Sequence, residues 1–346
     1  MLTRKTDNRT PQTRLETWDR ASGQQPDFVL RKALLLYNPL SGGRTERRRA
    51  DVEAVLDVLH ESGLTVTASV TGSAERATAQ AREAAQSGMD AVFACGGDGT
   101  IHDVLQGLVG TQCALGIIPL GTANTLAHDL RIPRNPVAAA RAALSSRPRR
   151  LAVGKIDYHD LGGNPASRFF TVAVGIGVDA HLFYRLNQEF KTRLGMTAYY
   201  AKATQLWLSH KMEFFQAEYV ESNTRLSRQA RVSELLAVRI RHFGGVLREL
   251  APGASLSRSD VRLVLFHTRN RFRFLQHIVR GWLGQSWNVK GIELRSAERV
   301  ACTYLPGTDA ELRIFVEADG ELVGTLPVGI TMVPDALTLL VPPAAK

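Results

Sequence analysis

Short apolar runs alternate with longer stretches of helical periodicity between Ala33 and about Arg150. A parallel sheet requires this alternation, because a crossover helix must carry the chain back between neighbouring strands. Residues 28–150 are therefore predicted to form an α/β domain with a doubly wound parallel sheet. The expected strands are Ala33–Tyr37, Leu64–Val70, Ala91–Cys95 and Ala114–Ile118, and the expected helices are Thr45–Glu61, Ala74–Gln86 and Thr100–Leu108.

The pattern changes after Arg150, where most connections between the predicted strands are too short for crossover helices. Residues 151–343 are predicted to form an antiparallel β domain, whose last segment is free to return to the first domain. Helical spacing interrupts this pattern between about Ala180 and Ser209, and residues 1–27 are expected to be a polar tail. The expected strands are Phe169–Val174, Glu213–Val220, Glu234–Ile240, Val261–His267, Arg299–Tyr304, Glu311–Glu317 and Leu337–Val341.

Composition limits the classes of protein that this chain can belong to. The 346 residues carry 43 Lys and Arg against 33 Asp and Glu, a net charge of +10 that favours an anionic partner. The three cysteines lie far apart without a CxxC pair, which predicts a reducing compartment and argues against structural zinc. The first 25 residues lack the apolar core of a secretory signal, and no apolar run is long enough to span a membrane.

The turn Gly96-Gly97-Asp98-Gly99-Thr100 is the strongest candidate for a binding site. It follows a buried-looking strand and opens a helix, so its glycines allow the backbone and the helix N-terminus to approach a phosphate group. Beside a phosphate, Asp98 makes sense through a bridging cation or a ribose hydroxyl. The alternative is an ordinary glycine-rich turn, which is common at such junctions.

Two further polar loops are expected at the same edge of the sheet, because the carboxyl ends of parallel strands meet there. Asn38-Pro39-Leu40-Ser41-Gly42 follows the first strand and Gly121-Thr122-Ala123-Asn124-Thr125 follows the fourth, although each is also typical of a turn with a helix cap. The GxxxxGK[ST] motif of P-loop proteins, the HRD and DFG motifs of protein kinases and the GxGxxG spacing of dinucleotide sites are all absent.

These three loops occur in the order that is typical of one enzyme family, so the chain resembles the diacylglycerol kinase catalytic-domain family of lipid kinases. That family also includes sphingosine and ceramide kinases and bacterial YegS-type enzymes. The resemblance covers about Arg31 to Pro343. Its further landmarks are Val174–Ala180, Leu194–Tyr199, Gly244-Gly245 before Pro252, and Glu317-Ala318-Asp319-Gly320-Glu321 followed by Pro327 and Pro334.

The resemblance implies ATP-dependent phosphorylation of a lipid hydroxyl, with ATP between the α/β domain and a β-sandwich domain. Diacylglycerol is the first expected substrate, and a sphingoid base, ceramide or another amphiphilic alcohol is the alternative. A regulator that kept the fold but lost turnover also stays open. The residues expected to bind the nucleotide are Asn38, Pro39, Ser41, Gly42, Thr71, Gly96, Gly97, Asp98, Gly99, Thr100, Gly121, Thr122 and Asn124.

The resemblance further implies Mg²⁺ carried by ATP, with Asp98 and Asp319 as its candidate protein ligands. We expect a cytoplasmic protein bound peripherally to the inner face of the membrane. A nucleic-acid partner is not expected, because no known readout motif is present. A homodimer remains open.

Asp319 and Glu321 are the candidate catalytic residues. In an extended strand, residues two apart face the same side, so both carboxylates would reach one hydroxyl and one metal ion. The resemblance implies that Glu321 is the base and that Asp319 supports it, although the sequence does not set that order. The alternative is a tight hairpin with Asp319-Gly320 at its turn, and both readings can hold together.

One segment departs from the family pattern. Bacterial relatives usually carry an Asp-Gly after the glycine pair that holds a structural metal, whereas this chain has Ser259 at the matching position and Asp260 one place later. Because such a metal prefers a carboxylate in its oxygen cage, we do not expect this second metal site. His102, just inside the predicted helix, is expected to be a surface or capping residue.

A basic and aromatic segment runs from Val261 to Ile292 without any acidic residue. Cationic groups beside aromatic rings suit an anionic bilayer surface, so this segment is the candidate for membrane docking. The alternative is that its apolar residues complete the core while the arginines form a solvated rim. The residues chosen for membrane contact are Arg271, Phe272, Arg273 and Trp282.

Overall fold

The structure is a computed structural model and describes residues 28–39, 45–177, 212–243, 250–283, 288–309 and 311–343. Its first half is built on four parallel strands in the order β2-β1-β3-β4. Every residue of β3 and β4 is buried, as a sheet covered on both faces requires. The strands are β1 (Lys32–Tyr37), β2 (Thr65–Val70), β3 (Ala91–Gly96) and β4 (Ala114–Pro119).

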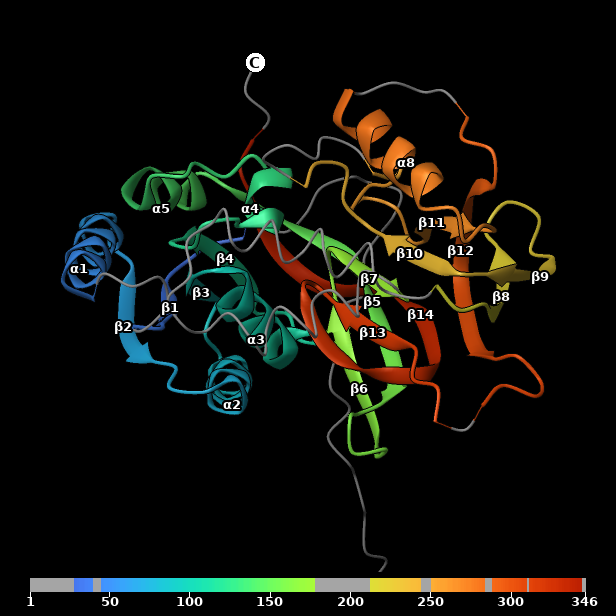
Figure 1. The fold of residues 1–346 in the computed structure, drawn as a ribbon. Helices are drawn as coiled ribbons and strands as arrows, with labels where there is room; N and C mark the ends of the chain where they lie inside the picture. Colours follow the sequence, from blue (N-terminus) through green and yellow to red (C-terminus); the bar gives the residue numbers. More distant parts are fainter. Residues whose placement is uncertain are drawn as a thin grey trace, which may run out of the picture.

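The described residues of the first half form five helices, four of which lie on the faces of this sheet. Figure 1 shows α1 and α5 on one side of the strands and α2 and α3 on the other, so the sheet is covered on both faces. The predicted bounds of α1 and α2 are confirmed, whereas α3 begins two residues earlier than expected and α4 and α5 were not predicted. The helices are α1 (Thr45–Glu61), α2 (Ala74–Gln86), α3 (Asp98–Leu108), α4 (Thr125–Asp129) and α5 (Pro136–Leu144).

The second half is dominated by antiparallel strands. Six of them pair in the cycle β14-β13-β7-β10-β11-β12, and β12 pairs back with β14, so the sheet closes on itself around a second core. The strands are β5 (Arg147–His159), β6 (Pro165–Phe170), β7 (Ala173–Ile176), β8 (Phe215–Glu221), β9 (Ser227–Val232), β10 (Glu234–Val238), β11 (Val261–Phe266), β12 (Ile292–Tyr304), β13 (Phe315–Ala318) and β14 (Glu321–Val341).

Several features of this half differ from the expectation or lie beyond it. Strands β5 and β9 were not predicted, because their polar and apolar residues alternate without a clean period. The helix α8 (Arg271–Leu283) was not predicted either, although its apolar residues recur at helical spacing. The helical segment expected between about 180 and 209 lies outside the described residues. No helix in the described ranges is long and apolar enough to cross a membrane.

The two halves share one continuous sheet. The end of β14 returns to the first half, where Thr338 and Leu339 pair in parallel with Ala114 and Leu115 of β4. Strand β5 runs antiparallel to β14 along both halves, so residue 150 lies inside a strand. This pairing fixes β13 and the start of β14 relative to the carboxyl ends of the parallel strands.

A buried arginine organises the loop before β11. Arg239 has no exposed surface, and its guanidinium donates to the carbonyl oxygens of Ala152 at 2.6 Å, Leu256 at 3.3 Å, Arg258 at 3.0 Å and Asp260 at 3.1 Å. The Asp260 carboxylate accepts from Arg258 at 2.6 Å and 2.5 Å. In this loop the backbone carbonyls therefore converge on an internal cation.

Candidate active site

Tight packing leaves no room for a side chain at Gly96, in the turn between β3 and α3, or at Gly121, in the loop after β4. A Cβ added at Gly96 would lie 2.5 Å from the Thr100 hydroxyl oxygen, and one at Gly121 would lie 2.6 Å from the Cα of Gly97. Two glycine loops from neighbouring strands therefore touch backbone to backbone at the carboxyl edge of the sheet. Gly97 caps the eleven-residue helix α3 without a side-chain hydrogen bond, which leaves the first N–H groups of the helix to a ligand.

Asp98 fastens these two loops together. One of its carboxylate oxygens accepts the Asn124 N–H at 2.9 Å and the other accepts the Thr125 N–H at 2.7 Å, at the start of α4. Asn124 adopts a left-handed conformation with φ of 47°, and its side chain accepts from the Gly121 N–H at 3.2 Å and donates to the Gly121 carbonyl at 2.6 Å. Asp98 therefore shapes the two glycine loops through both of its oxygens.

The remaining nucleotide candidates lie at the ends of the parallel strands. Asn38 and Pro39 follow β1 directly, and the buried Thr71 follows β2, where its N–H donates to the Tyr37 carbonyl at 3.0 Å. Thr122 is exposed at the tip of its loop. The predicted candidates Ser41 and Gly42 lie outside the described residues.

Arg48 of α1 adds a cation to this edge of the sheet. Its guanidinium donates to the Leu120 carbonyl at 2.9 Å, directly before Gly121. This contact brings a positive charge to the loop at the end of β4, where it would attract a phosphate.

A cavity of about 390 Å³ opens beside the same loop. It lies next to Asn124, and its rim is basic. Its lining residues are Pro119, Ala123, Asn124, Ala127, His128, Arg131, Ile132, Arg134 and His242. Asp129 of α4 accepts the N–H groups of Arg241 and His242 at 3.0 Å and 2.8 Å, so these hydrogen bonds join the two halves of the chain beside the cavity.

Asp319 and Glu321 do not share one extended strand, and the alternative expectation, a tight hairpin with Asp319-Gly320 at its turn, is confirmed. Asp319 and Gly320 form the two-residue turn between β13 and β14, with φ of 50° and 84°, so they are not part of an extended strand. Glu317 accepts the Gly320 N–H at 2.9 Å and tightens the turn. The Asp319 side chain is buried at this turn, whereas that of Glu321 is 46% exposed.

Asp319 is a buried hydrogen-bond acceptor. Its carboxylate accepts N–H groups of Thr171 at 2.9 Å, Val172 at 2.9 Å and Ala173 at 3.1 Å, and it lies 3.0 Å from His102 Nδ1. Burial alone would raise the pKa of Asp319, but these hydrogen bonds hold it below its ordinary value. The predicted Mg²⁺ ligand is thus enclosed by protein donors, which leaves no room for a metal ion at its oxygens.

His102 is buried rather than exposed, which corrects the expectation of a surface histidine. Both side chains that reach its Nε2, Arg168 through Nε and Gln106 through Nε2, can only donate there. Nε2 must therefore accept, and the ring proton lies on Nδ1, pointing to Asp319. This chain of hydrogen bonds connects the β13–β14 turn to α3.

Glu321 is half-exposed at the first position of β14, and Arg168 of β6 holds it. The Arg168 guanidinium lies 2.7 Å from Glu321 Oε2 and 3.7 Å from Asp103 Oδ1. A Cβ at Gly99 would lie 3.3 Å from Glu321 Oε1, so the carboxylate faces the glycine turn. Burial, together with the negative charge of Glu321, raises the pKa of Asp103 to about 6.

The sequence reasoning missed Asp103 and Arg168. The signal for Asp103 is helical spacing, because Gly99, His102, Asp103 and Gln106 lie on one face of α3 at intervals of three and four residues. Arg168 had no such signal, since its partners are far away in the sequence.

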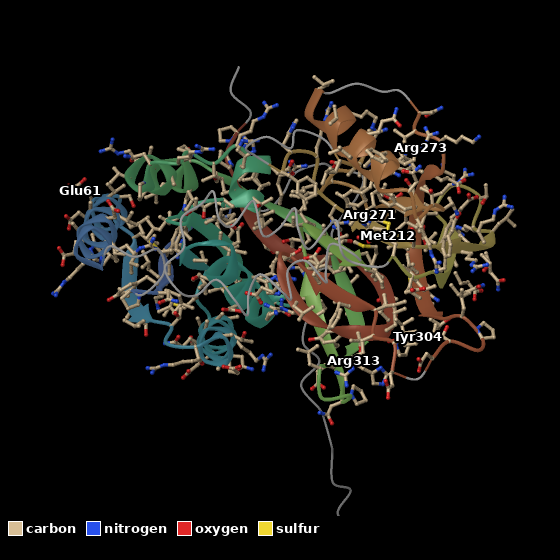
Figure 2. All side chains as sticks on the ribbon, in the orientation of Figure 1. Glu61, Met212, Arg271, Arg273, Tyr304 and Arg313 are labelled. Atoms are coloured by element: carbon tan, nitrogen blue, oxygen red, sulfur yellow. The ribbon has the colours of Figure 1, made fainter. Side chains whose placement is uncertain are left out.

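Across the described part of the chain, no three His, Cys, Asp or Glu side chains gather as a metal site. A second cavity, of about 380 Å³, lies near Tyr304 and Arg313, at the end of the β domain away from α8 (Figure 2). It shares no lining residue with the glycine loops, so it is not part of this candidate site.

Comparison with known families agrees with this architecture. Residues 32–156 match the family model described as the diacylglycerol kinase catalytic domain, and residues 172–341 match the YegS C-terminal NAD kinase beta sandwich-like domain. The chain belongs to the diacylglycerol kinase catalytic-domain family of lipid kinases. The resemblance inferred from the motifs is confirmed.

Individual relatives are similar over almost the whole chain. A diacylglycerol kinase of Bacillus subtilis is 28% identical over 301 residues, which cover 86% of this chain and 92% of the relative. A diacylglycerol kinase of Mycobacterium tuberculosis is 28% identical over 326 residues, which cover 93% and 99%. The fold is similar to the crystal structure of a diacylglycerol kinase from Bacillus anthracis, with a TM-score of 0.65, 19% identity and coverage of 91% and 98%.

Proposed function

We propose that this protein transfers the γ-phosphoryl group of ATP to a lipid hydroxyl, with diacylglycerol as the substrate and phosphatidic acid as the product. One observation carries the proposal: the carboxylate of Glu321, from the β domain, faces Gly99 in the glycine turn of the α/β domain. Turns of this type bind phosphate groups. A carboxylate in that position stands where a terminal phosphate and an acceptor hydroxyl would meet. The names of the relatives support a diacylglycerol substrate.

In this proposal, ATP lies along the carboxyl edge of the parallel sheet. The phosphates accept N–H groups at the start of α3, where the helix dipole favours negative charge. Glycines at positions 97, 99 and 121 allow the phosphates to approach the backbone closely, and Arg48 lies beside the same loop. ATP as the donor places the reaction on the cytosolic side of a membrane.

Glu321 is the proposed catalytic base. Its carboxylate accepts the proton of the lipid hydroxyl while the hydroxyl oxygen attacks the γ-phosphorus and the bond to the β-phosphate oxygen breaks, which releases ADP. Arg168 holds the carboxylate in place through the 2.7 Å ion pair. Asp319 is a positioning residue in this scheme, because it acts through His102 and the backbone of residues 171–173.

The side chains fit a magnesium ion that arrives with the nucleotide. Mg²⁺ in such sites keeps phosphate and water ligands and needs only one or two carboxylates. Glu321 faces the glycine turn and shares Arg168 with Asp103, whereas both oxygens of the predicted ligand Asp98 already accept backbone N–H groups. Bound there, the ion would neutralise charge on the transferring phosphate.

The test is transfer of labelled γ-phosphate from ATP to diacylglycerol, monoacylglycerol, sphingosine and ceramide in mixed micelles. Wild type should label diacylglycerol, and Glu321→Gln should lower the rate by about 100-fold or more, as loss of a general base does. Glu83→Gln, at an exposed glutamate of α2, is the matched control. A Glu321→Gln variant as active as wild type would remove Glu321 as the base.

The same panel separates the other readings. Labelling of sphingosine or ceramide instead of diacylglycerol would identify a kinase of that lipid class. Nucleotide binding without any labelled lipid would favour the catalytically inactive regulator.

A further inference from the structure

Helix α8 is anchored to the β domain by one face. Phe274, His277 and Arg280 are 6%, 1% and 3% exposed. The Phe274 ring lies 5.0 Å from that of Phe266, and His277 Nε2 lies 3.0 Å from the Leu250 carbonyl oxygen. The helix therefore presents one fixed face to solvent. Arg280, counted with the basic segment in the sequence, belongs to the inner face.

The outer face carries a continuous apolar stripe. Phe272, Leu275, Val279 and Leu283 are 80%, 47%, 37% and 50% exposed and follow one another at intervals of three and four residues. Nine large hydrophobic side chains are exposed in the described parts of the chain, and four of them lie in this one helix. Such clustering marks a surface for interaction, whereas scattered exposed residues need no explanation. Trp282, predicted to contact the membrane, has no described side chain.

Arginines lie at the N-terminal end of α8, where a positive charge lowers the stability of a helix. Arg271 and Arg273 occupy the first turn, which has no acidic residue, although the helix dipole disfavours cations there. Arg269 lies just before them, bound to Glu213 at 2.7 Å and half-exposed. Figure 2 labels Arg273 on α8, the helix that lies along the upper edge of the β domain in Figure 1. The positive charge at this end favours an external anionic partner.

We propose that the outer face of α8 docks the protein on an anionic lipid bilayer. The apolar stripe lies along one exposed helix, so it can enter the boundary between headgroups and acyl chains, and the arginines at its start meet lipid phosphates. The proposal extends the proposed lipid-kinase function, because a long-chain lipid alcohol is presented by a bilayer. Docking itself needs neither nucleotide nor turnover.

Vesicle co-sedimentation tests docking separately from catalysis. Wild type should bind vesicles of phosphatidylcholine mixed with phosphatidylglycerol, bind phosphatidylcholine alone more weakly, and lose binding at high ionic strength. The double variant Arg271→Glu, Arg273→Glu should bind the mixed vesicles about 30-fold more weakly or worse, because each basic residue contributes about 1 kcal/mol near such a surface. The double variant Phe272→Ser, Leu275→Ser should lose at least about tenfold.

Matched control variants make the same changes of charge and polarity on other parts of the surface. Arg82→Glu with Arg141→Glu changes the net charge equally on α2 and α5, and Leu226→Ser with Leu161→Ser removes exposed apolar side chains of other loops. Both controls should bind vesicles within about twofold of wild type. Thermal melting of every variant checks that the fold is kept, because Phe272, Leu275 and the control side chains are exposed and Arg271 and Arg273 are partly exposed.

Three results would overturn the proposal. The first is vesicle binding by both α8 variants equal to that of wild type, and the second is an equal loss in the charge control. The third is a wild type that ignores vesicles, combined with a change from dimer to monomer in the Phe272→Ser, Leu275→Ser variant, which would make the stripe an interface between two copies.

Activity on two forms of diacylglycerol separates this proposal from the proposed function. The α8 variants should phosphorylate a soluble short-chain diacylglycerol at the wild-type rate and a vesicle-embedded long-chain one more slowly. If wild type phosphorylates neither lipid, the proposed function fails, whereas the vesicle-binding results still decide the docking role.

Discussion

The guanidinium of Arg168 lies 2.7 Å from Oε2 of Glu321, and this ion pair joins β6 to the start of β14 beside the glycine turn. Glu321 is 46% exposed, so Arg168 contributes mainly by restricting where the carboxylate points. In the proposed reaction this orientation directs the base toward the acceptor hydroxyl.

Replacing Arg168 by Met should lower kcat at least about tenfold and leave KM for ATP nearly unchanged, because the lost contact acts on the base and not on the nucleotide. Arg168→Lys should restore part of the rate, since it keeps the charge. Steady-state kinetics checks both variants, with the exposed Arg82→Met as control. A rise in KM for ATP at constant kcat would instead place Arg168 in nucleotide binding.

Asp319→Asn should destabilise the fold by about 3 kcal/mol. The N–H groups of Thr171, Val172 and Ala173 would lose the buried, negatively charged carboxylate that accepts their hydrogen bonds. The lowered pKa of Asp319 means that its stabilisation is present at neutral pH and is lost as the pH falls below about 4. Urea unfolding measures the change. Asp57→Asn, on the exposed side of α1, should stay within about 0.5 kcal/mol of wild type.

If Asp319 were only a metal ligand, its amide variant would keep wild-type stability and lose activity alone. Destabilisation together with reduced activity is the outcome expected of a buried positioning residue.

Gly121→Ala should weaken nucleotide binding by at least about tenfold, because the new Cβ would lie 2.6 Å from Gly97 Cα and 2.8 Å from Asn124 Oδ1 and would push the two loops apart. Calorimetric titration with ATP measures the affinity. Gly329→Ala adds the same methyl group where nothing lies within 4 Å and should bind ATP normally. Equal affinity of the two variants would show that ATP binds elsewhere.

Arg239→Met should lower the free energy of unfolding by about 3 kcal/mol or more, because buried carbonyl oxygens of four residues lose their donors. Burial lowers the pKa of Arg239 to about 10, which leaves it charged at neutral pH. Chemical denaturation checks the loss. Arg49→Met, at a side chain that is 84% exposed, should change stability by less than about 0.5 kcal/mol.

His277 should make the fold sensitive to mild acid. Burial lowers the pKa of His277 from its ordinary 6.5 to about 4. Between these two pH values His277 is protonated in the unfolded chain and neutral in the folded chain. The free energy of unfolding is therefore unaffected by His277 above about pH 6.5, and protonation of this residue in the unfolded chain lowers it by up to about 3 kcal/mol as the pH falls toward 4. In His277→Phe the decline of unfolding free energy over this interval should be smaller by that amount, and an unchanged decline would contradict the assignment.

Local pattern predicted the first half of the fold well. The bounds of α1 and α2 follow from apolar periodicity and from stop signals such as Gly63 and Gly88, which adopt φ of 84° and 79°. The glycine turn before α3 could also be predicted, because a strand, three glycines and a helix adjoin in the sequence. Antiparallel pairing in the second half was expected from short connections, although β5 and β9 were missed.

The family, the parallel sheet and the glycine loops could be predicted from the sequence, because they depend on neighbouring residues and on repeated spacing. The contacts within the candidate site depend on the three-dimensional fold. His102 and Asp319 are 217 positions apart and Arg168 and Glu321 are 153 apart, and no local pattern brings such residues together. Their contact depends on the turn at Asp319-Gly320 and on the pairing of the end of β14 with β4. Both features arise from strand pairing between residues that are distant in the sequence.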